Sequence, residues 1–100
     1  MVPLTHEPGV YSILCTTNSK CYVGRTSDLY RRKREHFKLL SEGRHYNPNL
    51  QSCWNLYGPD SLVFEVLDYG SIEELAILEQ HYMDEYRDCL MNTVLQPFAL

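Results

Sequence analysis

The sequence contains 100 residues, which is the length of one ordinary domain. Its apolar fraction of 44% is typical of a globular protein with a small core, and no apolar stretch is long enough to cross a membrane. The net charge of −4 argues against a protein whose whole surface binds nucleic acid. We therefore expect a single globular domain over residues 1–100, with a core of about residues 8–93.

The first part of the chain is predicted to form a hairpin followed by a helix. Residues 10–15 and 21–24 are rich in strand-forming side chains and flank a short polar turn, which is typical of two antiparallel strands. Ser27 or Asp28 is a suitable cap for a helix that continues to about Glu42. The glycine that follows favours the end of that helix.

The second part of the chain is predicted to add two helices and one strand. A helix fits residues 47–56, and the alternating residues 62–67 fit a third strand. Ser71 and Glu74 form a capping box, which opens a third helix over residues 71–86. The order ββααβα indicates an α/β (α+β) fold, in which a small three-stranded antiparallel sheet is flanked by three or more helices.

Basic residues are concentrated in one segment of this acidic chain. Residues 20–45 contain eight of the nine lysines and arginines and only three acids, so the segment has a net charge of +5 and the remainder −9. Such an asymmetry favours one phosphate-facing surface on an acidic body. The alternative is a solvated basic helix without a ligand.

The four cysteines are predicted to be reduced and mostly buried. The N-terminus lacks the basic start and apolar run of a secretory signal, so we expect no disulfide framework and a cytoplasmic, intracellular protein. A zinc site is not expected either, because no two cysteines have the short spacing of such sites.

One glutamate of the third helix conflicts with its surroundings. The apolar residues of this helix recur at intervals of three and four and form one stripe: Ile72, Leu75, Ala76, Tyr82, Met83 and Tyr86. Glu79 lies in the middle of this stripe, and a carboxylate directed at a core is costly unless it is paired or binds a cation. Glu79 is therefore predicted either to bind a metal ion or to form a structural ion pair, for example with an arginine of the first helix.

The first helix carries a second unusual pair of residues. Its apolar side consists of Leu29, Tyr30, Phe37, Leu39 and Leu40. His36 lies within that side and Arg32 at its edge, one turn apart, whereas Arg31 and other cations point away. A hydrogen-bonded core histidine is the simplest interpretation of His36 alone. With Arg32 beside it and Glu79 elsewhere, a functional site is favoured.

Two tripeptides of the hairpin resemble those of a known nuclease family. Gly9-Val10-Tyr11 and Tyr22-Val23-Gly24 are separated by ten residues, and the pair resembles the two tripeptides of the GIY-YIG endonucleases. Residues 43–64 are most similar to the intron-encoded homing endonucleases, and the resemblance extends over residues 9–92. Homing enzymes carry a separate DNA-recognition region that is not found here. The chain is therefore expected to be a catalytic fragment or a nuclease that obtains its specificity otherwise.

The resemblance implies a site and an activity. It places the family's helical arginine on Arg32, its histidine on His36 and its metal-binding glutamate on Glu79. A further site histidine falls on His45, and an asparagine near the end of the domain falls on Asn92. The implied activity is hydrolysis of DNA phosphodiester bonds by a metal-dependent endonuclease that uses Mg²⁺, or alternatively Mn²⁺.

Two tyrosines are candidates for the general base of this reaction. We favour Tyr11, with His36 relaying or accepting the proton, and Tyr22 is the alternative. Packing within the hairpin is the simpler interpretation of either tyrosine. A phenol is a weak base at neutral pH unless cations favour the phenolate, and Arg32 and the metal ion are expected to provide that field.

The remaining expectations concern substrate contacts and partners. Gly24 is expected to let the backbone approach DNA or to adopt an unusual φ, and Arg25 is expected to contact a phosphate. We expect DNA as the partner, no membrane, and a monomer that can dimerise transiently. Two other functions stay open, a non-catalytic nucleic-acid-binding module of the same fold and a structural or protein-interaction domain.

Overall fold

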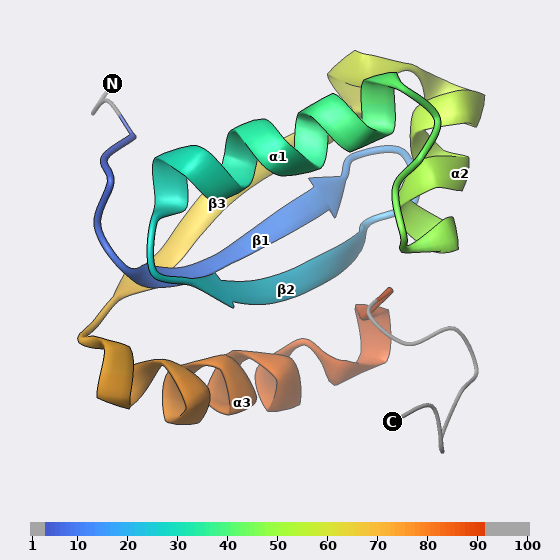
Figure 1. The fold of residues 1–100 in the computed structure, drawn as a ribbon. Coiled ribbons are helices and arrows are strands. Elements are labelled where there is room, and N and C mark those ends of the chain that lie inside the picture. The colour runs from blue at the N-terminus through green and yellow to red at the C-terminus, as the bar shows by residue number, and fades with distance from the viewer. Residues whose placement is uncertain (1–3, 92–100) are drawn as a thin grey trace.

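The three strands form one antiparallel sheet in which the first strand of the sequence is central. The computed structural model describes residues 4–91. β1 (Gly9–Cys15) lies between β2 (Lys20–Thr26) and β3 (Leu62–Tyr69) and pairs with both in antiparallel register. β2 and β3 are therefore the two edges of the sheet, as Figure 1 shows.

Helices cover both faces of this sheet. α1 (Leu29–Ser41) and α2 (Pro48–Tyr57) pack on one face, and α3 (Leu75–Glu85) packs on the other (Figure 1). Three single 3-10 turns complete the described chain: η1 (Pro59–Ser61), η2 (Ile72–Glu74) and η3 (Arg87–Cys89). The predicted order ββααβα and the antiparallel sheet are thus confirmed.

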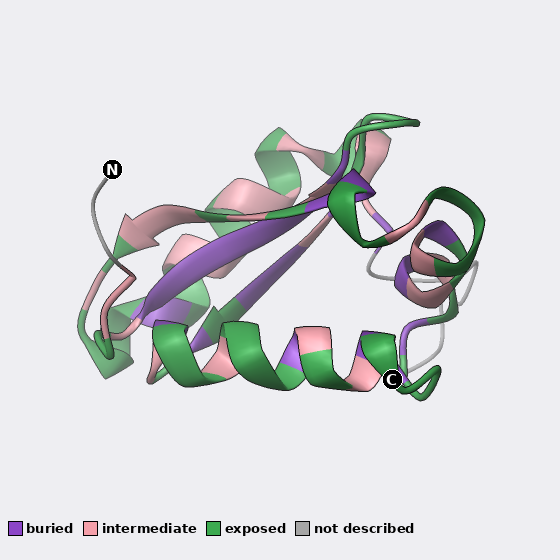
Figure 2. Ribbon diagram, turned by 90° about the horizontal axis from the view of Figure 1, so that it is seen from above, coloured by how far each residue is buried: buried purple, intermediate pink, exposed green. Residues whose placement is uncertain are grey.

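The alternation of β1 divides the core into two layers. Tyr11 and Ile13 face α1 and α2, whereas Val10 faces α3. In Figure 2, burial runs along most of β1, while the outer face of α1 is exposed. Because the central strand is buried on both faces, its side chains are held firmly in place.

The helix starts follow from the caps that the sequence predicts. The Asp28 side chain accepts a hydrogen bond from the backbone N–H of Arg31 (2.9 Å), and the Asn47 side chain caps α2 in the same way. The N–H of Ser71 donates to the Glu74 carboxylate (2.8 Å), as expected for the capping box.

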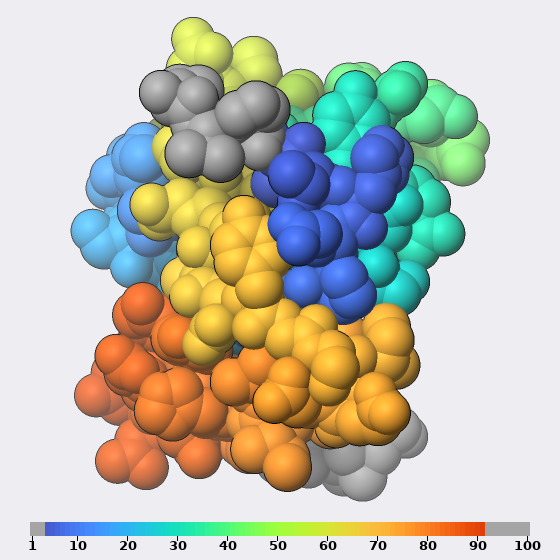
Figure 3. Space-filling model, turned by 90° about the vertical axis from the view of Figure 1, so that its left-hand side faces the viewer, coloured from blue at the N-terminus to red at the C-terminus, as the bar shows by residue number. Residues whose placement is uncertain are grey.

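The segment before β1 also closes the start of α1. The backbone N–H groups of Leu29 and Tyr30 donate to the carbonyls of Glu7 and Thr5, at 3.0 Å in both cases. These bonds satisfy donors that a helix N-terminus otherwise leaves to water. Figure 3 shows this segment in blue, between the teal of α1 and the yellow of β3.

The predicted apolar faces of two helices require correction. Tyr30 is exposed, and so are Ile72 and Ala76, which were expected in the core. The chain enters the third helix through a 3-10 turn with three residues per turn, so Ile72 loses phase with the buried residues of α3. Within α3 itself, the buried side begins at Leu75 and leaves Ala76 exposed. The residues of α3 that pack against the sheet are Leu75, Leu78, Tyr82 and Met83.

The cysteines agree with the prediction of reduced thiols. All four are free, three of them are buried, and Cys89 is half-buried. Within residues 4–91, none of the helices has the length and apolarity needed to traverse a bilayer.

Candidate active site

The two tyrosines of the hairpin lie on the face of the sheet that α1 covers. Tyr11 pairs with Gly24, and Ile13 pairs with Tyr22, so both tyrosine rings emerge on the same side. Their ring centres are 6.3 Å apart. Tyr11 is 1% exposed, whereas Tyr22 is half-buried near the sheet edge.

Gly24 makes room for the hydroxyl end of Tyr11. A Cβ atom at this position would lie 2.4 Å from the Tyr11 Oη atom and 2.5 Å from its Cζ atom, which no side chain tolerates. Among the described residues, the glycines with positive φ are Gly43 and Gly58. The expected unusual φ at Gly24 is therefore wrong, and the glycine is required by its neighbour across the strands.

A chain of hydrogen bonds leads from Tyr11 into the loop before α2. The Tyr11 Oη atom lies 2.6 Å from His36 Nε2, and His36 Nδ1 lies 2.7 Å from His45 Nε2. The backbone N–H of Asn47 donates to His45 Nδ1 at 3.0 Å. The loop is pinned on both sides, since His45 N–H donates to Gln51 (2.9 Å) and the Asn47 amide donates to the Met91 carbonyl (2.9 Å).

The direction of this chain follows from its last donor. A backbone amide has only a proton to give, so His45 Nδ1 accepts, and neutral His45 carries its proton on Nε2. His45 then donates to His36 Nδ1, which places the His36 proton on Nε2 and directs it at the Tyr11 oxygen. His36 is therefore a donor to Tyr11, opposite to the expected transfer of a proton from Tyr11 to His36.

Both histidines are neutral in the folded protein near neutral pH. Burial, together with the nearby Arg32 guanidinium, lowers the pKa of His36 to about 3. The same two causes lower the pKa of His45 to about 4. The stacked rings, with centres 5.0 Å apart, thus form an uncharged bridge between Tyr11 and the loop.

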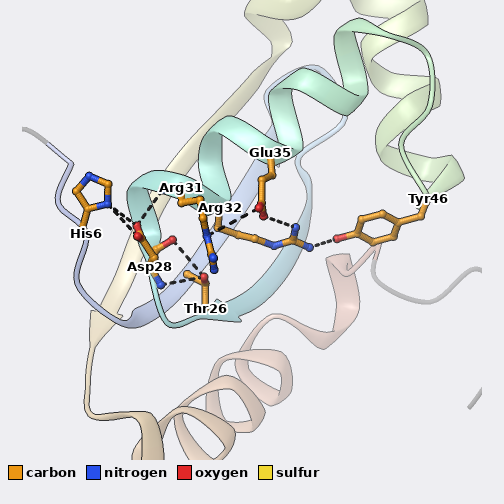
Figure 4. A network of polar contacts seen from close by, with 7 residues as sticks. All are labelled: His6, Thr26, Asp28, Arg31, Arg32, Glu35 and Tyr46. Carbon is orange, nitrogen blue, oxygen red and sulfur yellow. Dashed lines mark hydrogen bonds and ion pairs between the residues drawn. The ribbon is translucent and has the colours of Figure 1, made fainter.

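The Arg32 side chain reaches from α1 to Glu35 and Tyr46 (Figure 4). Its Nη1 atom donates to the Glu35 carboxylate at 3.1 Å, and its Nη2 atom donates to the hydroxyl of Tyr46. Its side chain stays 26% exposed. The guanidinium is therefore oriented by two partners and accessible to a ligand.

Tyr46 is a site residue that the sequence alone did not reveal. Its ring stacks on His45 with centres 4.4 Å apart, and its hydroxyl lies 3.4 Å from that of Tyr22. Tyr46 is 56% exposed although it lies against the buried histidines. The sequence feature that could have indicated Tyr46 is its position between His45 and Asn47, the residue that caps α2.

Burial controls the acidity of both tyrosines. It raises the pKa of Tyr11 above the ordinary value, and Arg32 is the largest opposing influence. Burial likewise raises the pKa of Tyr22, which the neighbouring Tyr11 increases further. The field of Arg32 favours the Tyr11 phenolate, but by itself it does not offset the effect of burial.

Glu79 lies on α3, which covers the opposite face of the sheet from α1. Its side chain is 22% exposed and lies 3.7 Å from Arg25 Nη1, measured to Oε1. Burial raises the pKa of Glu79, and Arg25 partly offsets this effect. The charge of Glu79 also acts on Tyr11. The ion-pair partner comes from β2 and not from the first helix.

The structure brings together most of the predicted site residues. Tyr11, Tyr22, Arg32, His36 and His45 form one network, and Glu79 and Arg25 lie across β2 from it. Asn92 lies outside the described residues. Tyr46 and the orienting Glu35 were not predicted.

The donor set fits a hydrated hard cation better than a closed metal centre. Among residues 4–91, no group of three or more His, Cys, Asp or Glu side chains is placed to hold a metal ion. Among the predicted site residues that the structure describes, Glu79 is the one with a carboxylate. Mg²⁺ commonly binds one or two carboxylates and completes its shell with water and substrate phosphate, so a single glutamate is compatible with it.

The chain resembles catalytic domains of intron-encoded endonucleases. The family profile of the GIY-YIG catalytic domain matches residues 7–93. The chain is 42% identical over 76 residues to intron-associated endonuclease 1 of Enterobacteria phage T4, which covers 74% of this chain and 30% of that protein. It is 31% identical over 97 residues to probable intron-encoded endonuclease 1 of Neurospora crassa, which covers 89% and 31%. The chain thus spans about 30% of the length of these relatives.

Solved structures agree with this assignment. The catalytic domain of the homing endonuclease I-TevI superposes with a TM-score of 0.79 at 26% identity, covering 88% of this chain and 99% of that one. A structure of a point mutant of the same catalytic domain gives a TM-score of 0.72 at 28% identity, with coverages of 81% and 84%.

Proposed function

Because the chain belongs to the GIY-YIG catalytic-domain family, we propose that it is a metal-dependent endonuclease that hydrolyses phosphodiester bonds of DNA. One observation carries the proposal: a buried tyrosine hydroxyl is held by a neutral histidine 2.6 Å away, and the charges of Arg32 and of the half-buried Glu79 both act on it. Phosphodiester hydrolysis needs a base for water and cations for the phosphate, and this arrangement offers a base, an arginine and a carboxylate for a metal ion.

Tyr11 acts as the general base through its hydroxyl oxygen. The His36 Nε2–H group points at this oxygen and stabilises the phenolate, because a donor favours the charged acceptor. The backbone N–H of Asn47 donates to His45, and His45 donates to His36 Nδ1. These bonds keep the His36 proton on Nε2, where it is donated to Tyr11. Tyr11 first releases its own proton to solvent, since neither histidine can accept it, and the phenolate then takes the proton of the attacking water. Tyr22 is the alternative base.

Arg32 binds the scissile phosphate. Its planar guanidinium matches two phosphate oxygens, and charge that develops in the transition state is stabilised by such a group. Glu35 and Tyr46 hold the guanidinium before DNA arrives, so less conformational freedom is lost on binding.

Glu79 is the residue that would hold the metal ion. When bound, Mg²⁺ or Mn²⁺ would neutralise phosphate charge and make a coordinated water more acidic. Arg25 screens the Glu79 carboxylate and, 3.7 Å away, is placed to contact a neighbouring phosphate. With one such site per chain, the protein cuts one strand per encounter as a monomer, and two cuts require a transient dimer or a second encounter.

A plasmid assay tests the proposed function. Supercoiled DNA is incubated with the protein in Mg²⁺, in Mn²⁺ and in chelator, and we expect nicked circles before linear DNA in the presence of metal only. Glu79→Ala should abolish cutting while the melting temperature stays the same or rises, since a half-buried charge is removed. Glu73→Ala, at an exposed position just before α3, is the matched control and should cut normally.

The same assay separates the alternative function. If wild-type protein binds DNA in a salt-dependent manner but cuts none with either metal, it is a non-catalytic nucleic-acid-binding module. Near-normal cutting by Glu79→Ala in Mg²⁺ would show that the metal assignment is wrong.

A further inference from the structure

A hollow opens where β2 ends and the third helix begins, beside the proposed metal-binding residue. Its volume is about 390 Å³. It is lined by Arg25, Thr26, Ser27, Ile72, Leu75 and Ala76. We call it the Arg25–Ala76 hollow. In Figure 3, the orange segment at the start of α3 forms the lower part of the molecule below the blue segment that precedes β1.

Two of the apolar residues that line this hollow are exposed to solvent. Ile72 is 58% exposed, and Ala76 is also exposed. Single apolar residues on a surface need no explanation, but these two line the same concavity. Ala76 also precedes Glu79 by about one turn of α3, so the apolar strip of Ile72 and Ala76 ends beside the proposed metal ligand.

The charge of the hollow complements a phosphate. Arg25 lines it and also reaches to within 3.7 Å of Glu79, so one side chain connects the hollow to the cleavage site. The other side chains that line it are uncharged. A surface with one cation and an adjoining apolar strip matches a nucleotide, which has an anionic phosphate and a largely apolar base face.

We propose that the Arg25–Ala76 hollow binds the nucleotide next to the scissile phosphate, with the face of its base against Ile72 and Ala76 and its phosphate near Arg25. The proposal rests on the proposed endonuclease function and extends it to sequence preference. The volume lies near the lower end of the range of roughly 300–1,000 Å³ that ligand pockets occupy, which suits one nucleotide. The hollow thereby helps to select the position of the cut.

A pair of isoleucines provides the test. Ile72 lines the hollow, whereas Ile77, which is 77% exposed on the same helical segment, does not. Ile72→Ser and Ile77→Ser are compared with wild type on DNA that is randomised around the cut, and the cleaved ends are sequenced. We expect Ile72→Ser to change the base preference beside the cut and to lower kcat/KM about five- to tenfold, as the loss of an apolar contact does. Ile77→Ser should match wild type, and both variants should keep the melting temperature.

A second variant tests the proposal independently of whether Ile72→Ser folds. Ala76→Leu partly fills the hollow at an exposed helical position and should also change the base preference. The proposal is overturned if wild type cuts DNA but Ile72→Ser and Ala76→Leu keep its base preference, even where the overall rate falls. If wild type cuts no DNA, the proposed endonuclease function itself fails, which is a distinct result.

Discussion

The Nε2 atom of His36 lies 2.6 Å from the hydroxyl oxygen of Tyr11, and His36 donates this hydrogen bond. The direction is set by the backbone N–H of Asn47, which donates to His45 Nδ1 and so leaves the proton of neutral His45 on Nε2. His45 then donates to His36 Nδ1, and the His36 proton on Nε2 is directed at the tyrosine. The two histidines thus hold the Tyr11 oxygen ready to carry negative charge. Neither has a free nitrogen for the proton that Tyr11 releases.

Tyr11→Phe should therefore lose both activity and some stability. We expect cleavage to fall about 10²-fold or more, the usual effect of losing a general base. The buried His36 N–H also loses its acceptor, which costs about 1 kcal/mol or more and lowers the melting temperature by a few degrees. Tyr22→Phe should show a smaller rate defect and no thermal shift, because the Tyr22 hydroxyl has only a long 3.4 Å contact with Tyr46. The opposite order of rate defects would assign the base to Tyr22.

The cleavage rate should rise with pH from about 6 to 9. A base that must lose its own proton becomes more abundant as pH approaches its pKa from below, and burial raises the pKa of Tyr11 beyond the ordinary value for tyrosine. No inflection is expected near pH 6.5, because His36 and His45 have pKa values of about 3 and 4. Initial rates at saturating metal and DNA measure the profile. A flat profile, or a step near pH 6.5, would contradict the roles of these three residues.

The buried histidines should make the protein less stable in acid. Their folded-state pKa values, about 3 for His36 and about 4 for His45, lie below the ordinary 6.5, so the unfolded chain binds more protons between these values. The free energy of unfolding should then be highest above pH 6.5 from this cause and should decrease as pH falls toward 4. Urea denaturation at several pH values measures this free energy of unfolding. His45→Asn should reduce its dependence on pH, whereas His81→Ala, at an exposed position, should leave that dependence unchanged.

Arg32→Ala should lower the cleavage rate about 10²-fold or more, as the loss of one group that stabilises transition-state charge does. Arg32→Lys should restore little, because a point charge cannot contact two phosphate oxygens as the planar guanidinium does. Arg34→Ala is the control, since Arg34 is exposed on the same helix and lies over the Tyr30 ring, 6.0 Å from its centre. An equal loss in the Arg34 variant would show that general basicity matters and not the position of Arg32.

Tyr46→Phe should weaken catalysis without affecting the fold. The Tyr46 hydroxyl accepts a hydrogen bond from Arg32, and its removal frees the guanidinium, so we expect roughly a three- to tenfold loss in rate from poorer orientation. Tyr57→Phe is the matched control for Tyr46→Phe, because Tyr57 is 46% exposed and lies at the end of α2. Both variants should melt like wild type. Equal rates for the two variants would show that Glu35 alone orients Arg32.

The sequence by itself determined the features that depend on neighbouring residues. Ser27 or Asp28 as a cap and the capping box of Ser71 and Glu74 predicted where two helical segments begin, and alternation predicted the strands, because these interactions span only a few residues. Helical spacing was also sufficient to relate His36 to Arg32, and the conflict between Glu79 and its apolar neighbours was visible without coordinates.

Only the tertiary structure decided how distant segments meet. The hairpin register that brings Tyr11 over Gly24, the contact between His36 and His45, and the position of Tyr46 against Arg32 depend on packing that no local pattern encodes. The 3-10 turn before α3 shifted the helical phase, so Ile72 faces solvent at the proposed nucleotide hollow and not the core. The position of the proton on His36 likewise follows from the backbone N–H of Asn47, because this group can only donate and the fold places it against His45 Nδ1.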